Sequence, residues 1–198
     1  MPTDVAIVVE DELSLAVLRR VIDYSPRKFR VTRTFVERGF GNIKRSIRKY
    51  SQASHVIPHI VLTDLDNAEC VVEFRKAWAA DNLPETMLFR VAVRETEAWL
   101  LADQTSFAEF AGIPVKKVPA LPDTLADPKQ TLVNLVRHSR SRRLASELVP
   151  PPGSRVPIGP LYNERLSAYV REHWNPEAAL DCSPSLRRTI DRLGSFLR

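Results

Sequence analysis

The chain has 198 residues, of which 44% are hydrophobic and 27% are charged, so one domain with a sizeable core is expected. No apolar run approaches the ~20 residues that a membrane span needs, and residues 1–4 lack the basic start and apolar core of an export signal. We therefore expect a cytoplasmic protein without membrane contact, in which Cys70 and Cys182 are free thiols.

The net charge of +5 is unevenly distributed along the chain. Residues 27–49 carry nine basic side chains and a single acidic one, and a second basic run covers 137–143. Clustered positive charge favours phosphate backbones, although a solvated basic face without a partner is the plain alternative. The predicted nucleic-acid-binding residues are Arg38, Lys44, Arg45, Arg48 and Lys49.

The first half of the chain alternates between strand-like and helix-like segments. The continuous β-branched run 5–9 is typical of a strand buried on both faces, and 13–24 has the pattern of an amphipathic helix. The pattern further predicts strands at 29–35, 57–63 and 87–93, and helices at 42–51, 68–80 and 95–102. This alternation predicts an α/β fold with a Rossmann-like, mostly parallel sheet flanked by helices.

The second half of the chain has a different pattern. Residues 112–128 and 149–160 are rich in proline and predict ordered loops, and helices are predicted at 129–148, 162–173 and 185–197. We therefore expect an α/β core over 1–110 and a helical, loop-rich C-terminal extension over 111–198, packed together as one domain. Trp99 and Trp174 are expected to pack in the core rather than to stack on bases.

Acidic residues follow the predicted strands. Glu10 closes the first strand, and Asp64 and Asp66 close the third. Ligands of open parallel sheets bind outside the carboxyl ends of the strands. Because residues two apart in an extended chain point the same way, Asp64 and Asp66 are expected to converge, as are Glu95 and Glu97 after the fourth strand.

Taken singly, each of these residues has a simpler explanation. The glutamates could be favourable charges at helix N-termini, and the aspartates could cap a helix or form a turn. As a set they would repel one another unless a cation or protons neutralised them. Carboxylate oxygens suit Mg²⁺ or Mn²⁺, which can polarise a phosphodiester and activate water. The predicted metal ligands are Glu10, Asp64, Asp66, Glu95 and Glu97.

Residues 7–10 and 60–66 resemble the Toprim domain, which has a Glu at the end of its first strand and Asp-x-Asp at the end of a later one. That domain occurs in topoisomerases, primases, recombination proteins and the overcoming-lysogenization-defect nucleases. A closer resemblance is to a family of bacterial Toprim-like proteins of unassigned function, through segments 94–103, 127–129, 162–163 and 183–186. It covers most of the chain, and Arg-Glu-x-Glu-Ala-Trp is its most specific part. The chain departs from it at Asp11, where such proteins carry a glycine for a tight turn.

The resemblance implies metal-dependent, nuclease-type chemistry with the catalytic residues Glu10, Asp64, Asp66 and Lys129. Glu10 would act as general acid or base and the two aspartates would hold magnesium. The acidic pair after the fourth strand would complete a second metal position. Lys129 would stabilise charge near the scissile phosphate, and an exposed lysine at a helix start is its plain alternative. The resemblance further implies a separately encoded ATPase partner and a role in defence against phage or foreign DNA.

Two other functions remain open from the sequence. The first is a Toprim-like module that binds nucleic acid or a partner without cleaving it. The second is a receiver domain, whose acidic start resembles residues 10–12 and in which Asp64 would accept a phosphoryl group. A receiver expects a small hydroxyl residue after its fourth strand, where Arg94 and Glu95 stand, and a lysine closing a fifth strand, where 112–122 predicts a loop.

Overall fold

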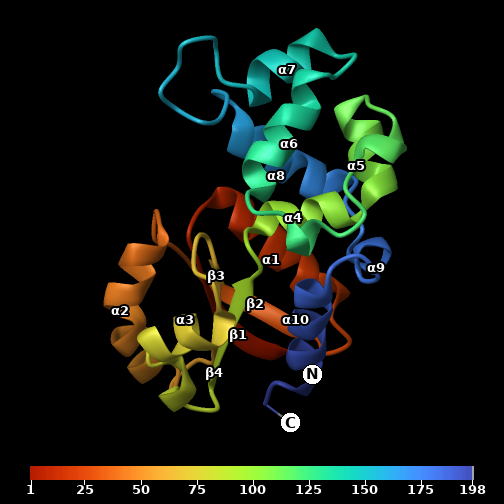
Figure 1. The fold of residues 1–198 in the computed structure, drawn as a ribbon. Helices are drawn as coiled ribbons and strands as arrows, with labels where there is room; N and C mark the ends of the chain where they lie inside the picture. The colour runs from red at the N-terminus through yellow and green to blue at the C-terminus, as the bar shows by residue number, and fades with distance from the viewer. Residues whose placement is uncertain (198) are drawn as a thin grey trace.

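A four-stranded, all-parallel sheet forms the centre of the molecule (Figure 1). The computed structural model describes residues 1–197, apart from the side chain of Phe40. The strands are β1 (Thr3–Val9), β2 (Phe29–Val36), β3 (His59–Asp64) and β4 (Met87–Ala92), in the order β2-β1-β3-β4. The predicted α/β fold, with a Rossmann-like parallel sheet and a helical C-terminal region, is confirmed.

Helices cover both faces of this sheet, as Figure 1 shows. The first half supplies α1 (Glu12–Tyr24), α2 (Phe40–Ala53), α3 (Val71–Ala77), α4 (Thr96–Ala102) and α5 (Gln104–Ala111). The second half supplies α6 (Pro128–Arg137), α7 (Arg142–Leu148), α8 (Tyr162–Glu172), α9 (Pro176–Ala179) and α10 (Pro184–Ser195). Short 3₁₀ turns lie at Ala80–Asn82, Val115–Lys117 and Pro122–Thr124.

Alternate residues of the central strands enter two separate cores. Ile7 and Ile60 face the larger core, which includes residues of α1, α4 and α10, whereas Val8 and Val61 face the smaller core under α2 and α3. This is the period-two alternation of a strand that is buried on both faces. The larger core contains residues from both halves of the chain, so the C-terminal helices complete the α/β unit.

Two predicted segments differ from the structure. The single helix predicted over 129–148 is wrong, because α6 ends at Arg137 and α7 begins at Arg142. The Ser141 side chain accepts a hydrogen bond from the N–H of Leu144 at 3.2 Å, and this cap starts a new helix. The helix predicted over 68–80 is shorter, at Val71–Ala77.

The carboxyl ends of β1, β3 and β4 lie side by side, and helices of the second half close over them. Segment α4 begins directly after β4 and packs against α6. Both tryptophans of this region are fully buried: Trp99 Nε1 donates to Ser185 Oγ at 2.7 Å, and Trp174 Nε1 donates to the Trp99 carbonyl at 3.1 Å. The expectation that they pack in the core is confirmed, and their bonds fix α4 above the strand ends.

Candidate functional site

Glu10 links the ends of β1 and β3. It follows a strand whose last five residues are fully buried. Its Oε1 accepts a hydrogen bond from the hydroxyl of Thr63 and another, of 2.9 Å, from the N–H of Asp64. The carboxylate therefore lies across the end of the neighbouring strand, as the parallel topology predicted.

The backbone from Asp64 to Asp66 is not the extended chain from which their convergence was predicted. Strand β3 ends at Asp64, and Asp66 has a left-handed backbone with φ of 51°. The Asp66 N–H donates to the Arg94 carbonyl at 2.8 Å. Aspartate is one of the few residues that tolerate this backbone, so the chain turns sharply here instead of alternating.

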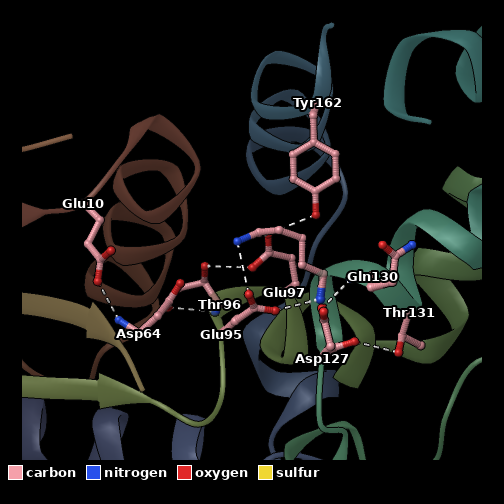
Figure 2. A network of polar contacts seen from close by, with 10 residues as sticks. Glu10, Asp64, Glu95, Thr96, Glu97, Asp127, Gln130, Thr131 and Tyr162 are labelled. Atoms are coloured by element: carbon pink, nitrogen blue, oxygen red, sulfur yellow. Dashed lines mark hydrogen bonds and ion pairs between the residues drawn. The ribbon is translucent and has the colours of Figure 1, made fainter. Parts of the chain in front are cut away.

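Asp64 is held by the start of α4. It is 8% exposed, and its Oδ1 accepts a hydrogen bond of 2.9 Å from the N–H of Thr96. Figure 2 shows Asp64 and Thr96 lying between Glu10 on one side and the Glu95–Glu97 pair on the other. Asp64 therefore connects the two groups of acidic residues.

Glu95 and Glu97 meet at one lysine. Glu95 accepts hydrogen bonds from the backbone N–H of Lys129 at 2.8 Å and from its ammonium at 3.2 Å, and that ammonium lies 3.7 Å from Glu97 Oε1. The Tyr162 hydroxyl donates to Glu97 Oε1 at 2.9 Å (Figure 2). The two glutamates thus converge as expected, although α4 begins at Thr96 and their backbone is not a continued strand.

Burial and mutual repulsion raise the pKa of the carboxyl groups. Burial raises the pKa of Asp64 well above its usual range, and the charges of Glu97 and Glu10 raise it further. Burial raises the pKa of Glu10 and of Asp66 as well. The cluster therefore retains protons, or attracts cations, more strongly than isolated carboxylates do.

Lys129 acts as the internal counterion of this cluster. Burial raises the pKa of Glu97 to about 7, with Lys129 opposing that rise and Glu95 adding to it. Burial alone would lower the pKa of Lys129, but Glu97, Glu95 and Asp64 together hold it above its ordinary value. The lysine therefore stays protonated. Because its ammonium pairs with Glu95 and Glu97, Lys129 is not the exposed helix-start lysine that was its plain alternative.

The oxygens of Glu10 and Asp64 are unequally engaged. In the described chain Glu10 Oε2 and Asp64 Oδ2 make no hydrogen bond, and neither atom is fully buried. Within residues 1–197, no three His, Cys, Asp or Glu side chains already stand in an arrangement that could hold a metal ion. A cation at this site would therefore require side-chain rotation.

A cavity of about 350 Å³ opens beside Glu10. Arg38 and Gly39, just before α2, form part of its wall, and Asn163 of α8 forms another part. A basic side chain thus faces the same space as the acidic strand end. This places an anion-binding group next to the carboxylate predicted to act as acid or base.

The basic residues of α2 form an exposed face. Ile43, Ile47 and Tyr50 of this helix are buried against the sheet. The side chains turned to solvent are Lys44, Arg45, Arg48 and Lys49 of α2, together with Arg38 just before the helix. In the described chain none of these five forms an ion pair, and Arg45 bonds to the Asn42 side chain. Their charge is available to a polyanion.

Asp11 fits the backbone without strain. Its φ of −150° is extended, and its Oδ1 accepts the N–H of Ser14 at 2.8 Å as the N-cap of α1. No glycine is required at this position, because the conformation is open to any residue. The departure from the Toprim pattern therefore leaves the start of the helix well formed.

Sequence reasoning missed three partners of the acidic residues. They are Thr63, whose hydroxyl bonds to Glu10, Thr96, whose N–H bonds to Asp64, and the Tyr162 hydroxyl at Glu97. The adjacency of Thr63 to Asp64 and of Thr96 to Glu95 was a usable signal. Tyr162 stands 65 residues from Glu97, and nothing local in the sequence indicates that pairing.

The sheet differs from the one that a receiver domain expects. Within residues 1–197 the sheet has four strands, so Lys129 is brought to the cluster by helix α6 and not by a fifth strand. A receiver would place a side-chain hydroxyl after the fourth strand, whereas here Thr96 bonds to Asp64 through its backbone N–H.

No family model, curated protein or solved structure matched the chain when the three were searched. Among the helices of residues 1–197, none combines the length and apolar character that crossing a bilayer requires.

Proposed function

We propose that the chain is a Toprim-type, Mg²⁺- or Mn²⁺-dependent nuclease that hydrolyses phosphodiester bonds of nucleic acid. The observation that carries the proposal is that the Asp64 N–H donates to Glu10 at neighbouring strand ends, while one oxygen of each carboxylate has no hydrogen-bond partner in the described chain. Their raised pKa values are those of a site that gains from a bound cation.

The donor chemistry fits a hard divalent cation. Glu10, Asp64 and Asp66 offer carboxylate oxygens, the ligands that Mg²⁺ prefers. When bound there, such an ion would polarise the phosphodiester and lower the pKa of a water molecule. Glu10 would hold or release a proton at its open oxygen, where burial already raises its pKa.

The other residues would hold and orient the substrate. The exposed face of α2 would bind the phosphate backbone by counterion release, and Arg38 lies where that face meets the cavity beside Glu10. Lys129 holds Glu95 and Glu97 in place, so its predicted contact with the scissile phosphate would require it to exchange partners. We assign it first to positioning of the acidic pair.

The resemblance to Toprim-like proteins supports the wider setting of the proposal. A separately encoded ATPase would be the protein partner, and defence against phage or foreign DNA the role, in the cytoplasm. Activity assays should therefore be run with and without an ATPase whose gene lies next to the gene of this protein.

A non-catalytic module that binds nucleic acid is the second candidate, and one observation favours it. The Lys129 ammonium already neutralises Glu95 and Glu97, and within residues 1–197 no ready-made three-ligand metal site is present. In such a module the acidic cluster would be a structural ion-pair network. Binding to α2 would then be the whole activity.

The test is cleavage of labelled single- and double-stranded DNA and RNA with Mg²⁺, Mn²⁺ or EDTA. We expect metal-dependent cleavage that falls at least about 100-fold in Glu10→Gln and Asp64→Asn, because each removes a group that acts on the reacting phosphate. The exposed Glu73→Gln is the matched control and retains full activity. Salt-sensitive binding survives in all variants.

Absence of metal-dependent cleavage, with and without the ATPase partner, contradicts the nuclease proposal. Retained nucleic-acid binding in that case supports the binding module. Covalent labelling of Asp64 by acetyl phosphate, lost in Asp64→Asn, would instead support the receiver function.

A further inference from the structure

The outer edge of β4 borders two adjoining cavities. Strand β4 ends the sheet and pairs only with β3, and its free edge lies between α3 and α10 (Figure 1). The cavities measure about 710 and 230 Å³ and share Arg75, Arg90 and Arg188 in their walls. This edge is not bare, because α10 packs against β4 and Arg75 donates to the carbonyl of Phe89.

Arg90 is the unusual residue of β4. Every other residue of that strand is buried, and its neighbours on the same face, Leu88 and Ala92, belong to the larger core. Arg90 Nε donates to Thr189 Oγ1 at 3.3 Å, and within residues 1–197 its terminal nitrogens make no hydrogen bond. A mostly buried guanidinium in an apolar strand requires a compensating partner.

Helix α10 adds two more arginines to the same cavity. Arg188 and Arg192 are four residues apart, and they therefore lie on one side of the helix. Like charges at this spacing repel each other slightly, so the pair does not stabilise the helix.

Arg75 has a different role, because its guanidinium is fully engaged. Its nitrogens donate to the carbonyls of Phe89 and Ala80, both at 3.2 Å, and to Asp81 at 3.3 Å. It closes the wall of the cavity across the free edge of β4. Its charge still contributes to the potential inside.

The cavity is short of negative charge. Four arginines line it against two carboxylates, and one of these, Asp81, is already paired with Arg75. In the described chain Arg90, Arg188 and Arg192 form no ion pair. Burial, together with the charges of the three other arginines, lowers the pKa of Arg90 to about 10.

Part of the cavity wall is apolar. Leu83, Met87, Phe89 and Phe196 contribute to its wall. Its volume lies in the range of small-molecule sites, which combine an apolar lining with a few convergent polar groups. An anion with an attached ring system matches both parts of the wall.

We propose that this cavity binds the terminal phosphate of a nucleotide, with Arg90, Arg188 and Arg192 on the phosphate and the apolar wall against the nucleoside. The nucleotide is either free or the 5′ end of a strand, because both offer the same phosphate and ring. Guanidinium groups are suited to phosphate through paired N–H donors.

This inference goes beyond the proposed nuclease and does not rest on it. The smaller cavity extends along β4 to Val93, and none of the acidic residues at the strand ends lines it. Binding there needs no metal. It can therefore be measured with the acidic site disabled.

The test measures affinity in EDTA at low salt, using 5′-AMP and a short single-stranded DNA with or without a 5′-phosphate. The main variant is Arg188→Ala/Arg192→Ala, because both side chains are exposed and their loss leaves the core intact. We expect about tenfold weaker phosphate binding for each arginine removed. Arg187→Ala, on the same helix but paired with Asp181, is the matched control and binds as the wild type does.

The probes separate the two sources of the phosphate. Tight binding of 5′-AMP indicates a free nucleotide, and tighter binding of the 5′-phosphorylated DNA than of the unphosphorylated DNA indicates a strand end. The proposal is overturned if 5′-AMP does not bind and DNA binds equally with and without the 5′-phosphate, or if the double substitution weakens the binding of none of the probes. Asp64→Asn is expected to bind all probes normally, so a failed nuclease assay does not decide this one.

Discussion

The acidic cluster and the arginine cavity treat buried charge in opposite ways. At the strand ends, Lys129 is held between Glu95 and Glu97 and neutralises part of the cluster from within the chain. At the edge of β4, Arg90 has only a threonine hydroxyl within residues 1–197. The acidic cluster is an ion-pair network. In the arginine cavity, the charge of Arg90 can be compensated only by solvent or by a ligand.

This difference determines how a substitution in each region should change the free energy of unfolding. Removing one member of a buried, compensated pair leaves an unpaired charge and is strongly destabilising. Removing an uncompensated buried charge relieves the fold instead. The two regions should therefore respond with opposite sign to substitution, which gives the comparison its sharpest test.

Lys129→Met should produce the largest loss of stability. It leaves Glu95 and Glu97 without their counterion, and we expect the free energy of unfolding at pH 8 to fall by about 4 kcal/mol. For a chain of this size that lowers Tm by about 10 °C. Urea and thermal unfolding in EDTA measure the effect.

The matched control for that substitution is Lys76→Met. Lys76 pairs with Glu73 at 3.0 Å on the surface, where such a pair contributes about 0–1 kcal/mol. If Lys129→Met changed stability no more than Lys76→Met does, the acidic cluster would not depend on its internal counterion. The contrast between the two regions would then disappear.

Glu97 should make stability depend on pH. Its pKa is about 7 in the fold against an ordinary value of 4.5, so the folded state binds more protons between these pH values. The unfolding free energy therefore falls as pH rises through this window, by up to about 3 kcal/mol from this group. Glu97→Gln should remove that part of the fall.

Urea unfolding at pH 5, 6, 7 and 8 in EDTA measures this slope. The exposed Glu73→Gln is expected to keep the wild-type slope. Added Mg²⁺ should reduce the fall in the wild type if the cluster binds the ion. An identical slope in the wild type and Glu97→Gln would show that Lys129 fully compensates Glu97.

Much of the fold and part of the site could be predicted from the sequence, because periodicity and strand ends are local properties. The buried run 5–9 and the carboxylates Glu10 and Asp64 lie where the pattern placed them. The position of Asp66 could not be predicted, because a single left-handed residue breaks the alternation on which the argument relied.

Long-range partners were the other limit. Tyr162 reaches the cluster from α8 through tertiary contacts that no local pattern encodes, and Lys129 of α6 was expected at the site only from the resemblance. The arginine cavity is a further example, because Arg90 and Thr189 are 99 residues apart. Spacing alone gives no reason to place α10 beside β4.

Arg90→Met should have the opposite sign to Lys129→Met. A methionine fills similar volume without a buried charge, so we expect the free energy of unfolding to rise by about 1–2 kcal/mol in phosphate-free buffer. Arg30→Met, which breaks an exposed pair with Asp4, is the control and should leave stability nearly unchanged. A clear destabilisation by Arg90→Met would mean that Arg90 is compensated within the fold, against the comparison.

The smallest effects are expected on α2, where the charges are exposed and neither compensated nor buried. Lys44→Ala and Arg48→Ala should leave stability nearly unchanged and weaken DNA binding modestly. Each should reduce the slope of log affinity against log salt by about 1, because each neutralised phosphate releases about one counterion. Fluorescence anisotropy between about 50 and 200 mM salt measures the slope. Lys76→Ala, on the α3 side of the molecule, should leave it unchanged; an equal change there would mean that net charge, and not the face of α2, determines binding.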